Sequence, residues 1–491
     1  MKVEELLNGL NYEGEIDNLL CEISSLTLNS KEVIKGSVFF ALNGNKQNGN
    51  NYILEALKNG AVLVISDEVC NIKNVIKVKN IRSVISKLAY KFYKPKKNRV
   101  KVIGVVGTNG KTSTTFIIKE ILSSVGKNVG VIGTLGIYYN NKFIEPFLTT
   151  PDAIYLYETL KNMANDGVEY AIIELSAHAI EQKRAQNIKF EALIFTNCTH
   201  DHLDYFKTFN EYKNVKASVF NKNSAKFAVV NADDELGREI IFNEKLPIVS
   251  YGVNEPSDVF AVNISLSSTL TKFVINSFDD VGFISTKLLG DFNVSNILSA
   301  ITTCQLLGVS LKDCVTAVNN LKPISGRLEY IESYNGADIF VDYAHTPDGL
   351  KNVLLSLKKI CKNKLTVVFG CGGNRDKAKR SEMGKIAGEY ADFTVITTDN
   401  PRYEEPYSII REIEKGIREK SLKYITVQNR YMATGYAISK LKEGDVLVIC
   451  GKGAEKEQEV MGVKLSYNDG LAVRDIIAKL DFGGELIWNY I

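Results

Sequence analysis

The stretch "KVIGVVGTNGKTSTTFIIKEILSSV", residues 101–125, decides the fold class of this sequence. An apolar run of strand length leads into a glycine turn, and a helical pattern begins directly after Gly110. This order is typical of a phosphate-binding loop, although Val105 stands where the usual G-x-x-x-x-G-K-[ST] spacing has its first glycine. The context therefore favours a nucleotide site over a purely structural turn between strand and helix.

The residues of this loop suit phosphate chemistry. Glycines let backbone amides face a phosphate, and the helix N-terminus adds its partial positive charge. Lys111 can neutralise the β- and γ-phosphates, and the Thr112 hydroxyl can ligate magnesium. The predicted nucleotide-binding residues here are Gly107, Thr108, Asn109, Gly110, Lys111, Thr112 and Ser113.

Outward from this loop, apolar runs of strand length alternate with helical patterns. Continuous Val/Ile runs between amphipathic helices predict a parallel sheet with helices on both faces. Residues 253–290 differ, because Ser, Thr and alternating apolar residues there favour antiparallel strands. The predicted parallel strands of this region are 101–107, 129–134, 169–175, 191–197 and 226–232, and a second series follows at 338–344, 365–372, 392–399 and 445–451.

The chain length of 491 residues is too great for a single hydrophobic core, and we predict three α/β domains. The first, residues 1–99, is a small mixed α/β unit that ends at the charged, proline-containing stretch 93–100. The second, residues 100–330, carries the phosphate-binding loop on a parallel sheet. The third, residues 331–491, is a Rossmann-like α/β domain.

The composition is that of an ordinary soluble globular protein. Apolar residues make up 45% and charged residues 24%, and the formal net charge of +3 gives no basis for a nucleic-acid or membrane-surface partner. Eight cysteines without a C-x-x-C pair indicate reduced thiols. The acidic first residues do not resemble a secretory signal, and no apolar run approaches the roughly 18 residues of a membrane span. We expect a cytoplasmic monomer without membrane insertion.

All four histidines lie in polar clusters that follow predicted strands. A single histidine is more often an ordinary loop or core residue than a ligand. In open parallel sheets, however, the carboxyl ends of strands form the ligand edge, and Glu174, Asp201 and Asp204 lie beside these histidines. Glu174, His202 and Thr112 are of types that can bind Mg²⁺, although magnesium prefers oxygen ligands. The histidines are His178, His200, His202 and His345.

Lys216 occupies an unusual place for a lysine. Tyr212 lies four residues before it and Phe220 four residues after it, so its helix face is partly apolar. The ordinary interpretation is a surface lysine that extends its charged end into water.

Taken together, ten ordered motifs resemble those of the Mur ligases, and they cover nearly the whole chain. Their order and spacing are similar to the members that add the third residue of the peptidoglycan stem peptide. The motifs are "GTNGKT" (107–112), "TTPD" (149–152), "ELSAHAIEQKR" (174–184), "FTNCTHDHLDYF" (195–206), "YKNVKASVF" (212–220), "GDFNVSNILSA" (290–300), "SGRLE" (325–329), "DYAHTPD" (342–348), "GCGGNRDKAKR" (370–380) and "TTDNPR" (397–402).

The resemblance implies an ATP-dependent, ADP-forming amide ligase that joins UDP-N-acetylmuramoyl-L-alanyl-D-glutamate to a diamino acid for cell-wall synthesis. In this family the γ-phosphate of ATP activates the substrate carboxylate, and the amine then attacks the acyl phosphate. The resemblance also implies two magnesium ions. Thr112 and Glu174 would hold one, and His202 with a carbamylated Lys216 would help to hold the second, which replaces the surface interpretation of that lysine.

The same resemblance places the substrates. It assigns ATP also to Asn296, Arg327, Asp342 and His345, and the catalytic roles to Lys111, Glu174, His202 and Lys216. It assigns the UDP-muramoyl-dipeptide to Leu28, Ser30, Thr149, Thr150, Ser176, Gln182 and Arg184. It assigns the incoming amino acid to Arg375, Asp399, Asn400, Pro401, Arg402, Gly451 and Glu455.

The motif "DNPR" with Arg402 resembles the form of the family that selects meso-diaminopimelate, which implies that molecule as the amine substrate. A physical reason agrees, because a guanidinium can bind the second carboxylate of diaminopimelate through two parallel hydrogen bonds. The alternative is that Arg402 caps the following helix or pairs with Glu404 or Glu405. L-lysine or another diamino acid remains an open alternative substrate.

Three departures from the family pattern and several rival functions stay open. Asn29 and Lys31 flank Ser30 where the family commonly has Asp-Ser-Arg, Ala454 replaces a histidine, and Asn374 stands where Asp is frequent.

The rivals are folylpolyglutamate synthetase, a MurF-like ligase, a non-catalytic nucleotide-binding paralogue and a P-loop GTPase. The motif "DNPR" and the separate first domain argue against the folate enzyme, and no second nucleotide-specificity motif supports a GTPase.

Overall fold

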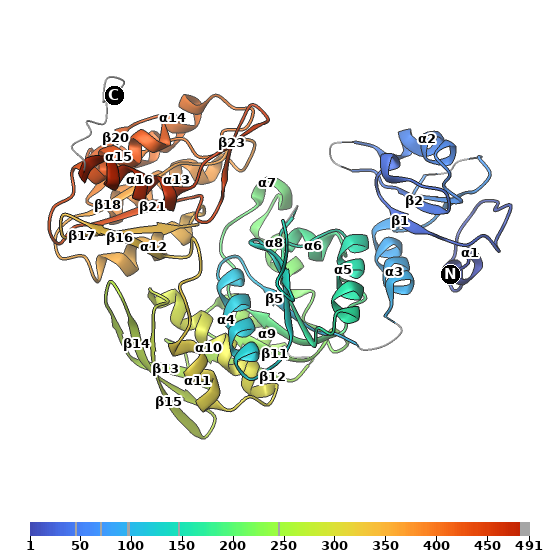
Figure 1. Ribbon diagram of the computed structural model, residues 1–491, viewed down its shortest axis with the longest axis horizontal. Coiled ribbons are helices and arrows are strands. Elements are labelled where there is room, and N and C mark those ends of the chain that lie inside the picture. Colours follow the sequence, from blue (N-terminus) through green and yellow to red (C-terminus); the bar gives the residue numbers. More distant parts are fainter. Residues whose placement is uncertain (45–46, 69–70, 96–98, 146–147, 244–245, 482–491) are drawn as a thin grey trace. The chain divides into compact units, whose positions relative to one another are not determined.

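The structure is a computed structural model, and it describes all residues except 45–46, 69–70, 96–98, 146–147, 244–245 and 482–491 (Figure 1). The chain forms two compact units, which we describe separately. The first unit comprises Met1–Gly104, Lys127–Leu193 and Val219–Lys226. The second comprises Val105–Gly126, Ile194–Ser218 and Phe227–Ile491.

The N-terminal region of the first unit is a small parallel sheet with the strand order β1-β2-β3-β4. Apolar side chains of α2 and of the adjoining strand face, including Phe39, Ala56 and Val64, form a buried core. Its elements are α1 (Val3–Leu7), β1 (Ser25–Thr27), η1 (Ser30–Glu32), β2 (Ser37–Ala41), η2 (Gly49–Tyr52), α2 (Ile53–Lys58), β3 (Leu63–Ser66), β4 (Val75–Lys77) and α3 (Ile81–Tyr93).

The middle of the chain forms one sheet with the strand order β15-β14-β13-β12-β11-β10-β5-β9-β6-β7-β8. Its strands are β5 (Lys101–Val106), β6 (Val129–Gly133), β7 (Gly136–Tyr139), β8 (Lys142–Ile144), β9 (Tyr170–Leu175), β10 (Phe190–Phe195), β11 (Ala225–Asn231), β12 (Ile248–Gly252), β13 (Val259–Leu266), β14 (Thr271–Ser277) and β15 (Asp280–Thr286). Its helices are α4 (Lys111–Ser124), α5 (Ala153–Asn165), α6 (Ala177–Glu181), α7 (Leu203–Phe206), α8 (Phe209–Ala217), α9 (Glu235–Phe242), α10 (Asp291–Leu306) and α11 (Leu311–Asn319).

The C-terminal region carries a six-stranded sheet with the order β16-β17-β21-β18-β19-β20, parallel except for the β16–β17 pair. Helices cover both faces of this sheet, and each face has its own hydrophobic core. Helices α12, α13 and α14 pack on one face, and α15 and α16 pack on the other face (Figure 1). Its elements are β16 (Glu329–Tyr334), β17 (Ala337–Asp342), α12 (Pro347–Lys358), β18 (Leu365–Phe369), α13 (Ala378–Tyr390), β19 (Phe393–Ile396), α14 (Pro406–Ile417), β20 (Tyr424–Thr426), α15 (Arg430–Ser439), β21 (Val446–Cys450), β22 (Glu457–Val460), β23 (Val463–Ser466) and α16 (Asp469–Asp481).

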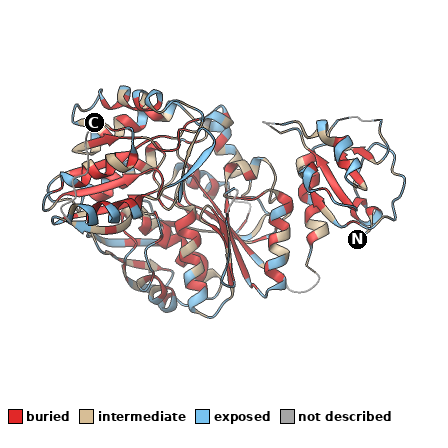
Figure 2. Ribbon diagram, turned by 45° about the horizontal axis from the view of Figure 1, so that its top comes forward, coloured by how far each residue is buried: buried red, intermediate tan, exposed pale blue. Residues whose placement is uncertain are grey.

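Local chemistry explains where the helices begin. Asp152 accepts hydrogen bonds from two backbone amides at the start of α5, and Thr346 caps α12 just before Pro347. The inner strands of the sheets, such as β5, β18 and β21, consist mainly of Val, Ile and Leu and are buried along most of their length, as the red strands of Figure 2 show. Such runs suit sheets that are covered on both faces.

The predicted fold class is confirmed, including the parallel strands of both series and the antiparallel strands β13 to β15 within 253–290. The boundary stretch 93–100 includes residues 96–98, which lie outside the described residues, and the three domain limits stay predictions. Seven cysteines in the described part of the chain are free, as expected, whereas Cys70 lies outside it. In that same part, no helix is both long and apolar enough to cross a membrane.

Candidate active site

The predicted phosphate-binding loop joins β5 to α4 in the second unit. Gly110 has φ +84°, and a Cβ on it would lie 2.3 Å from Oδ1 of Asn296, so this position requires glycine. Lys111 begins α4, and its Nζ donates hydrogen bonds to the carbonyls of Gly107 (2.8 Å) and Thr108 (2.7 Å). The helix N-terminus and the lysine therefore converge on the loop where a phosphate would bind.

Lys216 lies on α8, directly beside this loop. Its side chain is 1% exposed, and its Nζ donates a hydrogen bond to Oγ1 of Thr108 over 2.5 Å. The Nζ atom also lies 4.1 Å from the centre of the Tyr212 ring. Burial lowers the pKa of Lys216 to about 7, and the nearby positive charge of Lys111 adds to the effect. The surface interpretation of this lysine is therefore wrong.

His202 follows β10 and pairs with Asp201. The two side chains approach to 3.3 Å, and the backbone amide of His202 donates to Oδ1 of Asp201 over 2.9 Å. Burial alone would raise the pKa of Asp201, but the electrostatic effect of the neighbouring His202, with smaller contributions from His345, Lys379 and the His202 amide, outweighs burial and lowers the pKa. The predicted polar cluster at the end of β10 is thus present in the second unit.

The predicted ATP residues outside the loop lie in the same unit. Asn296 on α10 faces Gly110, and Nη2 of Arg327 donates to Oγ1 of Thr112 over 3.0 Å. Desolvation raises the pKa of Asp342 to about 6, even though its oxygens accept backbone hydrogen bonds from Leu328 and Ala344. Desolvation, helped by Lys379, lowers the pKa of His345 to about 4, so this imidazole is neutral at neutral pH. Asn296, Arg327 and Thr112 therefore surround one loop.

In the first unit, the residues expected to hold the muramoyl-dipeptide form one hydrogen-bond network. Oγ1 of Thr150 donates to the backbone carbonyl of Glu174 (2.6 Å) and accepts from the amide of Ser176 (3.0 Å). Arg184 donates to the carbonyl of Thr150 (2.5 Å) and to the side-chain carbonyl of Gln182 (2.8 Å). The network fixes the turn after β9 against the 149–150 segment.

Sequence reasoning missed Thr134, which links this network to Glu174. The amide and hydroxyl of Thr134 donate to the two carboxylate oxygens of Glu174 over 3.0 and 3.1 Å, and the hydroxyl also lies 3.2 Å from Oγ1 of Thr149. Glu174 is completely buried. Of the predicted uridine residues, Ser30 is buried and donates to Glu55 over 3.0 Å, whereas Leu28 is half-buried.

The predicted amino-acid residues follow three strands: Arg375 comes after β18, Asp399 to Arg402 after β19, and Gly451 and Glu455 after β21. The side-chain amide of Asn400 donates to Oε2 of Glu455 over 2.9 Å. Lys452, whose side chain is fully buried, donates to the same oxygen (2.6 Å), to Oδ1 of Asn400 (3.1 Å) and to the carbonyl of Glu457 (2.7 Å). Asn400 and Glu455 are therefore oriented by a buried ammonium that the sequence analysis did not single out.

Arg402 pairs with a residue that sequence reasoning missed. Its Nε lies 3.1 Å from Oε2 of Glu459, and its Nη1 donates to the carbonyl of Gly373 over 2.8 Å. The expected alternative partners are occupied elsewhere: Glu404 binds Arg380 through two hydrogen bonds, and Glu405 caps α14. The alternative that Arg402 pairs with Glu404 or Glu405 is therefore wrong.

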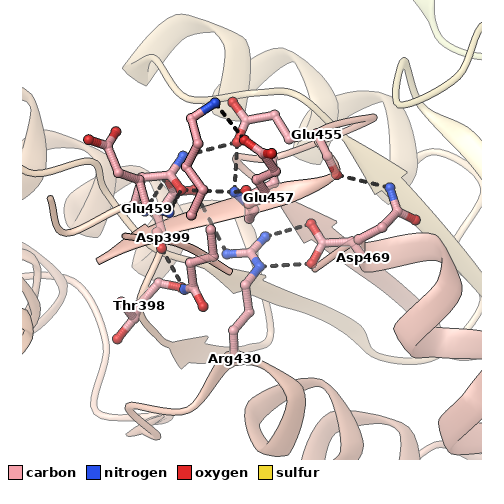
Figure 3. A network of polar contacts seen from close by, with 12 residues as sticks. Thr398, Asp399, Arg430, Glu455, Glu457, Glu459 and Asp469 are labelled. Atoms are coloured by element: carbon pink, nitrogen blue, oxygen red, sulfur yellow. Dashed lines mark hydrogen bonds and ion pairs between the residues drawn. The ribbon is translucent and has the colours of Figure 1, made fainter. Parts of the chain in front are cut away.

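Arg430 is fully buried and lies in a network of polar contacts with Asp399 and Asp469 (Figure 3). Arg430 donates to both carboxylate oxygens of Asp469 (2.8 Å each) and to the carbonyl of Cys450 (2.9 Å). Its Nη1 lies 3.9 Å from Oδ2 of Asp399. Burial opposes the charged form of Arg430, but the charge and hydrogen bonds of Asp469, together with Tyr467 and Asp399, outweigh it and raise the pKa of Arg430. This pair fixes the positions of Asp399 and the end of β21.

Comparison with known proteins identifies the family. Three family models match consecutive parts of the chain: "Mur ligase family, catalytic domain" at 22–110, "Mur ligase middle domain" at 105–304 and "Mur ligase, glutamate ligase domain" at 326–453. A protein of Alkaliphilus oremlandii, named UDP-N-acetylmuramoyl-L-alanyl-D-glutamate–2,6-diaminopimelate ligase, is 38% identical over 484 residues, which cover 98% of this chain and 99% of that protein. The chain belongs to the Mur ligase family.

Solved structures support the same family and fold. A structure titled as a UDP-N-acetylmuramoyl-L-alanyl-D-glutamate–2,6-diaminopimelate ligase has a TM-score of 0.71 and 31% identity, covering 98% of this chain and 99% of that chain. A MurF ligase from Thermotoga maritima in complex with ADP has a TM-score of 0.65 at 21% identity, covering 96% of this chain and all of that one, and shows likeness of fold. The membership rules out the GTPase alternative.

The structure gives physical reasons for one departure from the Mur ligase pattern. Asn374 has φ +52°, a conformation that asparagine tolerates better than most residues, and its side chain accepts a hydrogen bond from the amide of Tyr403. Asn29 caps η1 through the amide of Lys31. At Ala454, nothing in the structure explains why the family's histidine is absent.

Within the described residues, no group of three or more His, Cys, Asp or Glu side chains is arranged to hold a metal. The predicted magnesium residues of this Mur ligase include a threonine and a lysine, which do not belong to those types. Thr112 and Glu174 are both buried. Thr112 belongs to the second unit, and Glu174 belongs to the first. Their roles as metal ligands stay predictions.

Proposed function

We propose that this Mur ligase joins meso-diaminopimelate to UDP-N-acetylmuramoyl-L-alanyl-D-glutamate while ATP is converted to ADP, as a step in peptidoglycan precursor synthesis. The relatives that carry this activity in their names match the chain over almost its full length. The observation that carries the proposal is a chain of contacts: Arg402 pairs with Glu459, the amide of Glu459 donates to Asn400, and Asn400 donates to Glu455. A cation and a carboxylate close together complement the far end of diaminopimelate, which bears both a carboxylate and an ammonium group.

The substrates are assigned to the clusters described above. ATP binds to the loop Gly107 to Ser113 together with Asn296, Arg327, Asp342 and His345. The muramoyl-dipeptide binds to Thr149, Thr150, Ser176, Gln182 and Arg184, and its uridine end binds to Leu28 and Ser30. Diaminopimelate binds to Arg375, Gly451, Glu455 and the segment Asp399 to Arg402.

The chemistry requires positive charge between two anions. The carboxylate oxygen of the substrate attacks the γ-phosphorus and releases ADP, and the amine of diaminopimelate then attacks the acyl carbon and releases phosphate. Lys111 neutralises the phosphates while charge moves between ATP and the carboxylate. The N-terminus of α4 holds the phosphates through its backbone amides.

The residues present fit magnesium. Thr112, Glu174, His202 and a carbamylated Lys216 would hold two Mg²⁺ ions, and these supply charge that screens the repulsion between phosphate and carboxylate. The donor types are a hydroxyl, a carboxylate, an imidazole and a carbamate. An amine with a pKa of about 7 is about half neutral at neutral pH, whereas an ordinary lysine is almost fully protonated, and the neutral amine is the form that reacts with CO₂. Buried Lys216 therefore suits the modification.

The direct test is an amino-acid panel with the muramoyl-dipeptide and ATP, in which the product is identified by mass. We expect rapid addition of meso-diaminopimelate and slow addition of L-lysine, because lysine lacks the carboxylate that Arg402 would bind. Preferred use of L-lysine would contradict diaminopimelate as the amine substrate but would leave the proposed ligase activity intact. Binding of ATP without any product would indicate a non-catalytic paralogue.

A further inference from the structure

The hairpin β22–β23 is fastened to the segment that carries Arg402. The amide of Arg402 donates to the carbonyl of Glu459 (3.1 Å), and the amide of Met461 donates to the carbonyl of Arg402 (2.6 Å). The amide of Glu459 donates to Oδ1 of Asn400 over 2.9 Å. These bonds hold Arg402 at φ +53°, a left-handed conformation that non-glycine residues rarely adopt and that collects at functional sites.

The side chain of Arg402 is oriented by the same hairpin. Nε pairs with Oε2 of Glu459 at 3.1 Å, and Nη1 donates to the carbonyl of Gly373 at 2.8 Å. Arginine has five N–H donors, and two of them are used here. In the described part of the chain, Nη2 has no hydrogen bond. The end of the guanidinium formed by Nη1 and Nη2 therefore keeps enough donors for a substrate carboxylate.

We propose that Glu459 is a positioning and specificity-determining residue for the amine substrate, acting through Arg402. This inference rests on the proposed function. The Glu459 carboxylate anchors the Nε side of the guanidinium, so the opposite end is presented in one orientation. The backbone bonds of the hairpin hold residues 402 and 459 next to each other, so the Glu459 carboxylate remains within reach of Arg402 when the substrate carboxylate binds.

Charge balance gives the same pair a role in selection. Arg402 with Glu459, and Lys452 with Glu455, are two internal ion pairs of nearly zero net charge. The zwitterionic end of diaminopimelate adds one negative and one positive charge, and the site stays balanced. The distal end of L-lysine adds a lone positive charge, which is costly in a partly buried site. Without Glu459 the site gains a positive charge, which further disfavours the distal ammonium of lysine. Affinity for diaminopimelate should also fall, because Arg402 loses its anchor.

The variant Glu459→Gln tests this directly, because it keeps the shape and the backbone bonds and removes only the charge. We expect KM for diaminopimelate to rise about tenfold, the usual loss for a charge-assisted hydrogen bond. We expect kcat and KM for ATP to stay within about twofold, since Glu459 does not contact the nucleotide loop. The matched control is Glu457→Gln on the same strand, whose carboxylate pairs with Lys464 instead, and it should leave KM unchanged.

A double-mutant cycle separates positioning from a general structural effect. In an Arg402→Ala background, Glu459→Gln should change kcat/KM for diaminopimelate by less than about twofold, because its effect passes through the missing arginine. Equal losses in both backgrounds would overturn the inference, as would an unchanged or lowered KM in Glu459→Gln alone. Thermal unfolding of each variant identifies a loss that comes from misfolding, and Glu459→Asp, which keeps the charge, should restore part of the affinity. Failure of the unaltered protein to use diaminopimelate would instead contradict the proposed function.

Discussion

Lys216 and Thr108 are joined by a 2.5 Å hydrogen bond, so the lysine proposed to be carbamylated contacts the nucleotide loop itself. Thr108 in turn accepts a hydrogen bond from the amide of Thr199, three residues before His202. One hydroxyl thus connects the loop, α8 and the turn after β10. A change at Lys216 therefore alters the same small region in which phosphate and metal would meet.

Replacement of Lys216 by alanine is expected to abolish ligation, because the alanine variant cannot form the carbamate oxygen ligand. Short carboxylic acids should restore part of the activity by supplying the missing carboxylate. Initial rates with and without added formate or acetate are the measurement. Full activity of Lys216→Ala would contradict the proposed role.

The lowered pKa of Lys216 also sets a pH dependence. The amine is protonated below about pH 7 and neutral above it, and only the neutral amine forms a carbamate. After removal of CO₂, added bicarbonate should therefore restore activity more fully above this pH than below it. Equal recovery on both sides would argue against carbamylation.

Replacement of Lys111 by alanine should lower kcat by about 100- to 1000-fold, with a smaller change in KM for ATP, because its charge matters most as negative charge moves between ATP and the carboxylate. Steady-state kinetics with ATP varied measure the two effects. An unchanged kcat with only a raised KM would show that the loop merely binds the nucleotide.

Replacement of Arg402 by alanine or lysine should lower kcat/KM for diaminopimelate by about 100-fold, since a bidentate carboxylate contact is lost. ATP affinity should not change. Competition between diaminopimelate and L-lysine, followed by product mass, measures selection. Equal discrimination by the variant and the unaltered protein would show that selection lies elsewhere.

Replacement of Gly451 by alanine should impair amino-acid addition. Gly451 has φ +116°, and a Cβ there would lie 2.6 Å from Oδ2 of Asp399, so the carboxylate and its loop must shift. KM for diaminopimelate should rise by more than about tenfold, as for other losses of a charged contact. The control Gly126→Ala has φ +79° and no atom within 4 Å of its Cβ, so it introduces backbone strain alone. Equal KM changes in both variants would contradict this explanation.

The Arg380–Glu404 pair should contribute to acid stability. Hydrogen bonds from Arg380, against a smaller opposing effect of burial, lower the pKa of Glu404 from 4.5 to about 2. A lowered pKa in the folded state stabilises the protein above the unfolded value, so this contribution is complete above pH 4.5 and is lost as the pH falls towards 2. Glu404→Gln should therefore lower the free energy of unfolding at neutral pH and flatten its acid dependence in that window. Circular dichroism during acid titration measures this, and Glu419→Gln, in an exposed pair with Lys385, should behave like the unaltered protein.

Much of the fold could be predicted because buried strands leave continuous apolar runs, as in β9 and β21. The hairpin β7–β8 was missed although Asn140 and Asn141, both at positive φ, are a turn signal. The hairpin β22–β23 was missed because β22 is largely polar and strand 463–466 is exposed throughout. Such a segment has no burial pattern from which a strand could be inferred.

Residues of the candidate site could be predicted only where they belong to a recognisable sequence motif. Loop and strand-end residues such as Lys111 and Asn400 belong to recognisable motifs. Glu459 is 57 residues from Arg402, and Thr134 is 40 residues from Glu174. Pairs at such separations have no local sequence signature, so their contacts appear only in the folded chain. The hydrogen bond between Lys216 and Thr108 likewise joins residues that are 108 positions apart.

The most direct test of the ligase account is ADP release by the purified protein with all substrates and with each one omitted in turn. The account predicts that ADP forms at full rate only when ATP, the muramoyl-dipeptide and meso-diaminopimelate are all present, with one ADP for each tripeptide product. ADP release at the same rate without the muramoyl-dipeptide, or no release with the complete set, would contradict it.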